Sequence, residues 1–109
     1  MRRGDLVVAV APGAYGKPRP FLVVQSDLAT RAGSQSVTVA PLTSTVRGAP
    51  LFRVTIDPSA ENGLRTVSQV MVDKLVTLPR EKLGKPFGRL DFETMQRVNR
   101  SLSLWLGLV

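Results

Sequence analysis

Most of this chain alternates between short β-type segments and turns, and only its C-terminal end has the periodicity of a helix. Apolar and β-branched residues gather at residues 6–10, 21–25, 36–40, 51–56, 65–72 and 74–78, with an interruption near Asp73. Apolar and polar side chains alternate in residues 36–40 and 51–56, which predicts strands with one buried face. Pro and Gly mark the turns, most densely in residues 11–20. We predict a mainly β fold, a small antiparallel sheet bent toward a barrel.

The helical pattern at the C-terminal end is the clearest local signal. Asp91 is a typical N-cap residue, and Gly107 can end the helix as its C′ residue. Between them, apolar side chains recur at helical spacing at Phe92, Met95, Val98, Leu102, Trp105 and Leu106. We interpret this stripe as core, and the alternative is that Met95 and Trp105 belong to a partner site.

Composition narrows the possible chemistry. The 109 residues include 15 basic and 8 acidic side chains, a net charge of +7. This excess favours a polyanionic partner, because neutralised phosphates release counterions, although it can also serve solubility. The chain has no His and no Cys. This excludes catalysis by imidazole and by Ser-His triads, and it excludes disulfides and metal sites with imidazole or thiolate ligands. We expect neither a metal site nor a cofactor.

The N-terminus shows no signal-peptide pattern, and no apolar run approaches the ~20 residues of a membrane span. We therefore expect one cytoplasmic domain over residues 1–109, without membrane contact.

Three short segments combine polar side chains with constrained backbone. Prolines on both sides of Arg19 restrict the chain, and a guanidinium aimed in this way suits a phosphate, although it can also be an ordinary loop arginine. Thr43 and Ser44 can donate to phosphate oxygens or stabilise a local turn. Asp73 can act as a base, orient an arginine, or simply end a strand.

In this order, the segments resemble the MazF/PemK (Kid) toxins of bacterial toxin–antitoxin systems. The matching pieces are Arg3-Gly4-Asp5, residues 19–27 (RPFLVVQSD), residues 39–44 (VAPLTS), residues 72–75 (VDKL) and the helix at 95–108. The resemblance implies an SH3-like barrel with a C-terminal helix, which works as a homodimer. It also implies a toxin that cuts single-stranded mRNA at specific sequences and is neutralised by an acidic antitoxin.

The resemblance further implies a metal-independent endoribonuclease that uses the RNA's own 2′-hydroxyl and leaves 2′,3′-cyclic phosphate and 5′-hydroxyl ends. Its main catalytic pair falls on Arg19 and Thr43, and Asp73 matches an acidic position of the Kid branch. Because a guanidinium is not deprotonated in proteins, we expect Arg19 to stabilise the phosphorane charge rather than to donate a proton. Asp73 is then the candidate base. We expect RNA contacts from Lys17, Ser44, Gln69 and Lys74.

The chain departs from the family pattern at two positions beside Asp73. The Kid-type arginine two residues before the acid is Met71 here, and the family glutamine after the acid is Lys74. The loop at residues 11–18 also looks shorter and richer in proline than in MazF toxins. The cleavage sequence therefore stays open.

Two other functions compete with RNA cleavage. A CcdB-like poison of DNA gyrase shares the expected fold, and residues 24–27 and Trp105 resemble that branch. However, Leu106 separates Trp105 from Gly107, where that branch has a Trp-Gly ending. A small-barrel module that binds RNA without cleaving it would explain the charge but not the combination of Arg19 with Thr43.

Overall fold

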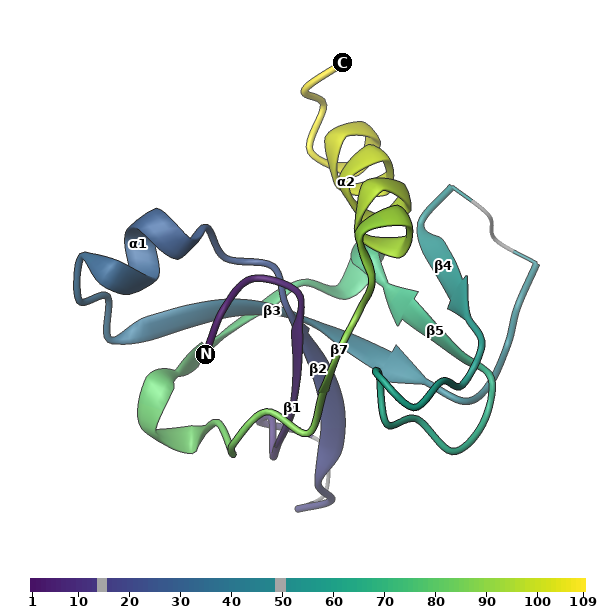
Figure 1. Cartoon of the computed structure of the whole chain (residues 1–109). Helices are drawn as coiled ribbons and strands as arrows, with labels where there is room; N and C mark the ends of the chain where they lie inside the picture. Colours follow the sequence, from purple (N-terminus) through teal and green to yellow (C-terminus); the bar gives the residue numbers. More distant parts are fainter. Residues whose placement is uncertain (14–15, 49–50) are drawn as a thin grey trace.

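The computed structural model describes residues 1–13, 16–48 and 51–109, and it shows a bent antiparallel sheet beside a C-terminal helix (Figure 1). The strands are β1 (Asp5–Ala9), β2 (Arg19–Val23), β3 (Ser36–Thr43), β4 (Arg53–Ile56), β5 (Ser68–Met71), β6 (Val76–Pro79) and β7 (Gly88–Arg89). The helices are α1 (Asp27–Arg31) and α2 (Phe92–Trp105), with 3-10 turns η1 (Val72–Lys74) and η2 (Arg80–Lys82). The strand order is β4-β5-β3-β2-β1-β7, with β6 on β3, and the bend of this sheet makes it a half-barrel (Figure 1). The predicted mainly β fold with a C-terminal helix is confirmed.

The longest strand, β3, changes its neighbour part-way along its length. Residues 36–39 pair with β6, and Leu42 and Thr43 pair with β5. The sequence pattern ended this strand at Ala40, which is wrong, because the strand continues through Pro41 to Thr43. Pro41 lies where the ladder passes from β6 to β5, and such an interruption accommodates a residue without an N–H. The extension brings Thr43 into the sheet.

Apolar side chains pack on both faces of the sheet. One cluster joins the sheet to α2 through Leu42, Val54, Val70, Val98 and Leu102, among others. The other lies on the opposite face and contains Val7, Phe21, Val23, Val37, Val39 and Leu78. Because successive strand residues point to opposite faces, both clusters draw on the same strands. Burial on both faces makes the sheet a rigid support for the residues at its margins.

Helix α2 begins and ends as its sequence predicts. The Asp91 carboxylate accepts a hydrogen bond from the Thr94 amide at 2.7 Å, and this bond holds the pKa of Asp91 below its usual value. At the other end, Gly107 has a φ of +71°, and the Leu108 amide donates to the carbonyl of Ser103 at 2.8 Å. This is a Schellman motif, which favours glycine because its φ is positive.

The core interpretation of the α2 stripe holds only for its middle. Met95, Val98 and Leu102 are buried, whereas Phe92 is 76% exposed and Trp105 is 45% exposed. Trp105 meets Phe52 edge to face at 5.1 Å between ring centroids. The last turn of α2 projects beyond the sheet (Figure 1), so its apolar side chains have little sheet to cover. The prediction that Trp105 is a core residue is therefore wrong.

The N-terminal Arg3-Gly4-Asp5 piece connects distant elements. The Arg3 guanidinium donates to the carbonyl of Val24 at 2.8 Å and to the side-chain oxygen of Asn99 on α2 at 2.7 Å. Burial lowers the pKa of Arg3, and the charge of Asp27 partly offsets that effect. Asp5 pairs with Arg89 of β7 at 2.6 Å. This piece therefore has a structural role.

The remaining differences concern strand ends and short elements. The strands predicted at 51–56, 65–72 and 74–78 are β4, β5 and β6, each of which begins two or three residues later. β2 begins at Arg19, two residues before the predicted strand, and α1 and β7 have no clear signal in the sequence. The predicted interruption near Asp73 is the turn η1. Ala14 and Tyr15, in the loop expected to influence the cleavage sequence, lie outside the described residues. Among the helices that the structure describes, none is both long and apolar enough to cross a bilayer.

Candidate active site

A cavity of about 440 Å³ brings Arg19 and Thr43 together. Sheet register explains why, because β2 and β3 pair Phe21 with Pro41. Continuing this antiparallel register for two residues places Arg19 opposite Thr43, with both side chains on the same face. The other lining residues come from the loops around these strand ends: Lys17, Pro18, Pro20, Leu42, Ser44, Thr45, Leu64, Arg65, Thr66 and Ser68. Lys17 and Ser44, which we expected to bind RNA, therefore lie beside Arg19 and Thr43.

The charge of this cavity is entirely positive. Lys17, Arg19 and Arg65 are its charged lining residues, and no carboxylate lines its described part. Arg65 was not singled out from the sequence, where it reads only as the beginning of a strand. In the structure it precedes β5, which pairs with the end of β3, and so it reaches the same cavity. Three cations around one cavity are a combination that suits a phosphate.

Of the two roles considered for the Thr43 hydroxyl, the structure shows the local one. Its oxygen accepts a hydrogen bond from the Thr45 amide at 3.1 Å, which stabilises the local turn. A hydroxyl that accepts a bond still carries its own proton to donate. The turn therefore fixes the position of the oxygen while the O–H remains available to a ligand in the cavity.

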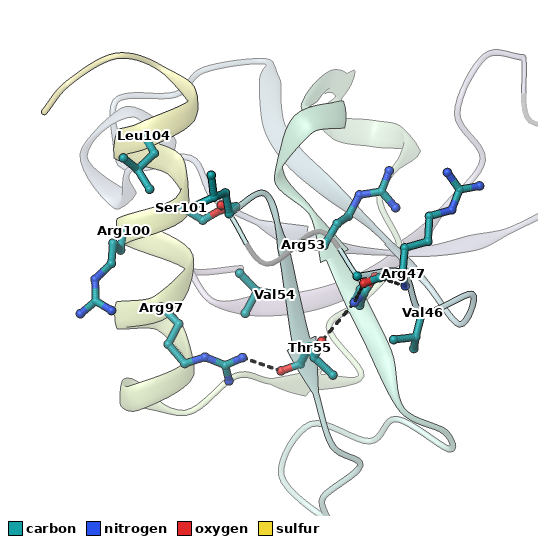
Figure 2. A pocket seen from close by; sticks show the side chains of 12 residues that line it. Val46, Arg47, Arg53, Val54, Thr55, Arg97, Arg100, Ser101 and Leu104 are labelled. Atoms are coloured by element: carbon teal, nitrogen blue, oxygen red, sulfur yellow. Dashed lines mark hydrogen bonds between the residues drawn. The ribbon is translucent and has the colours of Figure 1, made fainter.

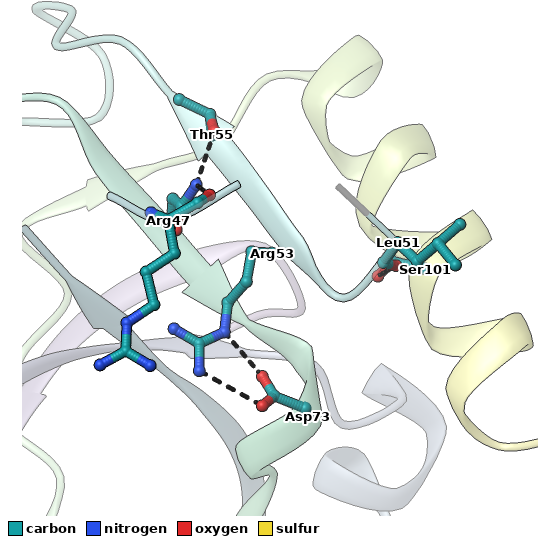
Figure 3. Close-up of polar contacts among 7 residues, drawn as sticks. Arg47, Leu51, Arg53, Thr55, Asp73 and Ser101 are labelled. Carbon is teal, nitrogen blue, oxygen red and sulfur yellow. Dashed lines mark hydrogen bonds and ion pairs between the residues drawn. The ribbon is translucent and has the colours of Figure 1, made fainter. Parts of the chain in front are cut away.

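Asp73 does not line this cavity. Its carboxylate receives two hydrogen bonds from Arg53 of β4, Nε to Oδ1 at 2.9 Å and a terminal nitrogen to Oδ2 at 3.3 Å (Figure 3). Burial raises the pKa of Asp73, but the bonds and charge of Arg53 outweigh it, so the pKa lies below its usual value. Arg53 is the register partner of Met71. The family pattern has an arginine where this chain has Met71, and here Arg53 supplies an arginine from the neighbouring strand instead. The sequence alone did not reveal this pairing.

Neither Gln69 nor Lys74 lines the Arg19 cavity, although Gln69 is the register partner of Thr43. Gln69 is 2% exposed. Its side-chain oxygen accepts from the backbone N–H of Arg47 at 3.0 Å. Its side-chain nitrogen donates to the backbone carbonyl of Arg47 at 2.8 Å and to the Thr55 hydroxyl at 3.1 Å. Gln69 therefore holds the loop after β3 in place. Lys74 is exposed on η1. Contact of either residue with RNA stays a prediction.

A second cavity, of about 510 Å³, lies between α2 and β4 (Figure 2), and we call it the α2 groove. Four arginines line it, namely Arg47, Arg53, Arg97 and Arg100. Its other lining residues are mostly aliphatic or small: Val46, Gly48, Leu51, Val54, Thr55, Gln69, Ser101 and Leu104. The Ser101 hydroxyl, which donates to the carbonyl of Leu51, ties α2 to the chain before β4.

Comparison with known proteins identifies the family. Residues 2–106 match the model of the PemK-like, MazF-like toxins of type II toxin–antitoxin systems. The chain belongs to this family. The match spans both the Arg19 cavity and α2, and it confirms the resemblance drawn from the sequence segments.

Individual MazF toxins are similar to this chain over nearly their whole length. The probable endoribonuclease MazF of Mycolicibacterium smegmatis is 47% identical over 109 residues, which cover 99% of this chain and 98% of the relative. The toxin MazF-mt6 of Mycobacterium tuberculosis has a TM-score of 0.80 at 30% identity, over 94% of this chain and 96% of that one. An endoribonuclease from a mycobacterial species, in complex with its cognate antitoxin, has a TM-score of 0.84 at 28% identity, over 100% and 97%. These relatives favour a ribonuclease over a gyrase poison.

Proposed function

We propose that this MazF-type toxin endoribonuclease cleaves single-stranded RNA in the Arg19 cavity, with the RNA's own 2′-hydroxyl as nucleophile. The supporting observation is that Arg19 and Thr43 line one cavity with two further cations, and that no carboxylate lines its described part. The 2′-oxygen attacks the adjacent phosphorus, and the bond to the 5′-oxygen breaks. The products are a 2′,3′-cyclic phosphate and a 5′-hydroxyl.

The residues of the cavity act on the charge that builds on the phosphorane. Arg19 donates to the nonbridging oxygens from a guanidinium that keeps its charge, and the Thr43 hydroxyl donates from its fixed position. Lys17 and Arg65 neutralise the neighbouring phosphates, and Ser44 offers a further hydroxyl. Asp73 as the base that removes the 2′-hydroxyl proton stays a prediction. Its lowered pKa and its two hydrogen bonds from Arg53 instead support the role of orienting that arginine, which lies outside the Arg19 cavity.

The experiment incubates the purified protein with a long single-stranded RNA in the presence of a chelator. We expect cleavage at a short sequence, with new 5′ ends that polynucleotide kinase labels without prior phosphatase treatment. Mapping these ends identifies the cleavage sequence. Intact RNA together with gyrase trapped on DNA would overturn this function in favour of the CcdB-like alternative.

The proposal includes a homodimer and an acidic antitoxin. Apolar side chains stay exposed at the end of α2, including Trp105, Leu106 and Leu108, and a second copy would bury them. Sedimentation equilibrium should give twice the mass of 11.8 kDa. A disordered acidic tail would suit the charge of +7. We therefore expect a small acidic protein, encoded beside this one, that neutralises it in the cytoplasm.

A further inference from the structure

One wall of the Arg19 cavity comes from the loop that joins β4 to β5 (Figure 1), residues 57–67, which we call the β4–β5 loop. Leu64, Arg65 and Thr66 of this loop line the cavity, and Arg65 is one of its three cations. Arg19 and Thr43 stand on paired strands, which fix their backbone. The β4–β5 loop belongs to no strand or helix, so other contacts have to fix the wall that it forms.

Asn62 holds the β4–β5 loop from within. It is 5% exposed, although the residues on both sides of it are exposed. Its Oδ1 accepts from the Ser59 amide at 3.0 Å and from the Leu64 amide at 2.9 Å. Its Nδ2 donates to the carbonyl of Asp57 at 2.9 Å. These bonds close the loop on the Asn62 side chain, and one of them fixes the first residue of the cavity wall.

The same part of the loop rests on β7. A Cβ at Gly88 would overlap the backbone carbonyl of Asn62, so the two backbones approach as only glycine allows. The Arg89 amide donates to the carbonyl of Glu61 at 3.0 Å. β7 pairs with β1, and β1 pairs with β2, the strand that begins at Arg19. The loop around Asn62 is therefore fixed relative to the sheet that carries the cavity.

Arg65 lies between two fixed backbone groups. On one side Asn62 holds the amide of Leu64, and on the other the hydroxyl of Ser68, a buried residue of β5, donates to the carbonyl of Thr66 at 3.1 Å. The Arg65 residue itself is exposed, and no carboxylate of the described chain pairs with it. A cation on a fixed backbone loses less freedom when a phosphate binds, which favours binding.

We propose that Asn62 is a positioning residue for RNA binding, because it fixes the Leu64 amide and thereby presents Arg65 to a phosphate in the Arg19 cavity. The inference rests on the proposed function, in which Arg65 neutralises a phosphate of the RNA. It assigns control of KM to a side chain that does not line the cavity, whereas Arg19 and Thr43 act on the reacting phosphate.

The test measures RNA cleavage by the full-length Asn62→Ala variant. Alanine leaves the Leu64 amide without its acceptor, so the backbone of Arg65 has to be ordered when RNA binds. We expect KM to rise about three- to tenfold. We expect kcat to stay within about twofold of the wild type, since strand pairing still holds Arg19 and Thr43.

A double variant separates positioning from a general loss of structure. In a chain that already carries Arg65→Ala, the change Asn62→Ala should alter KM by less than about twofold, because its effect acts through Arg65. A merely structural role would raise KM by the same factor with and without Arg65.

A conservative variant and a matched control complete the experiment. Asn62→Ser keeps an oxygen that can accept from the amide two residues on, as the Thr43 hydroxyl does from Thr45. Its KM should lie closer to that of the wild type than to that of Asn62→Ala. Asn99→Ala is the control, because its side-chain oxygen holds Arg3 at 2.7 Å, away from the cavity. It should lower stability and leave KM unchanged.

If Asn62→Ala does not fold, Ser59→Ala is a milder change to the same loop. The Ser59 hydroxyl accepts from the Asn62 amide at 3.1 Å, and Ser59 is exposed. Its loss should raise KM about twofold, and only while Arg65 is present.

Three results would overturn the role of Asn62. They are an unchanged KM in Asn62→Ala, an equal rise of KM in the chain that lacks Arg65, and an equal rise in Asn99→Ala. A wild-type protein that cleaves no RNA, or an Arg65→Ala variant with normal KM, would instead contradict the proposed function.

Discussion

The Arg19 cavity and the α2 groove are both cationic, yet they differ in what accompanies the charge. In the Arg19 cavity, hydroxyls of Thr43 and Ser44 lie beside the cations, and no carboxylate lines its described part. In the α2 groove, the cations surround an aliphatic floor, and one of them, Arg53, is already paired with Asp73. Positive charge alone therefore does not define a nuclease site. The α2 groove also has two hydroxyls, but that of Thr55 accepts from Gln69 and that of Ser101 donates to the carbonyl of Leu51. The proposed function therefore assigns cleavage to the first cavity.

The contrast between the two cavities fails most clearly if RNA cleavage does not require Arg19 and Thr43. We expect Arg19→Ala and Thr43→Ala each to lower kcat/KM for RNA cleavage by about 100-fold or more, as loss of a transition-state donor does. Thermal unfolding should hardly change, because Arg19 is exposed and Thr43 is only partly buried. Arg97→Ala is the matched control in the α2 groove and should keep its activity. Normal cleavage by both cavity variants would show that the site assignment is wrong.

The second prediction concerns the Arg53–Asp73 pair. Asp73→Asn should lower the free energy of unfolding by about 1–2 kcal/mol at neutral pH, because Arg53 is left with a weaker acceptor. Since the folded-state pKa of Asp73 is lowered, its contribution is complete above about pH 3.9. It is lost as the pH falls through the lowered value. Urea unfolding from pH 7 to pH 3 measures this difference between variant and wild type.

The activity of Asp73→Asn distinguishes a positioning role from a base. If Asp73 only orients Arg53, the variant should show a modest fall in kcat. Its rate should still decline at low pH as the rate of the wild type does. Normal stability combined with a 100-fold loss of cleavage and of that decline would identify Asp73 as the general base, as the sequence alone suggested.

The third prediction concerns Gln69, which lies between the two cavities. Gln69→Ala should cost about 1–2 kcal/mol of unfolding free energy, because the buried Gln69 amide makes three hydrogen bonds, to the backbone of Arg47 and to the Thr55 hydroxyl, that alanine cannot make. Cleavage should fall as well, since Gln69 holds the loop that follows Thr43 and Ser44. Gln96→Ala, on the exposed side of α2, is the control and should stay within about 0.5 kcal/mol. Normal cleavage would mean that this loop does not position the Thr43 and Ser44 hydroxyls.

The smallest expected effect comes from Arg65. Arg65→Ala should raise KM about tenfold, and it should reduce the salt dependence of RNA binding by about 0.7 in the slope, the loss of one phosphate contact on a single strand. Arg100→Ala should leave that slope unchanged. Fluorescence anisotropy with a labelled noncleavable RNA over a salt series measures both. A reduced slope for Arg100→Ala would extend the RNA path into the α2 groove.

The sequence predicted those features of the fold that depend on neighbouring residues. The caps of α2 are set within a few residues by Asp91 and Gly107, and strand alternation is visible at Val54 and Ile56. Trp105 was misjudged because helical spacing shows which side chains share a face but not where the sheet beneath them ends. The strand end at Ala40 was misjudged because Pro41 normally breaks a ladder, and only the change from β6 to β5 makes it tolerable there.

By itself, the sequence determined the chemical repertoire of this protein: no imidazole or thiol, an excess of arginine, and proline-flanked Arg19 with Thr43 in an order that resembles the MazF family. Tertiary structure decided which of these side chains meet. Pairing of β2 with β3 brought Arg19 and Thr43 to one cavity, the chain before β5 brought Arg65 to it, and β4 supplied Arg53 to Asp73. The physical reason is that strand pairing and packing on α2 bring together residues that are far apart in the sequence. A local pattern does not show which distant residues come into contact.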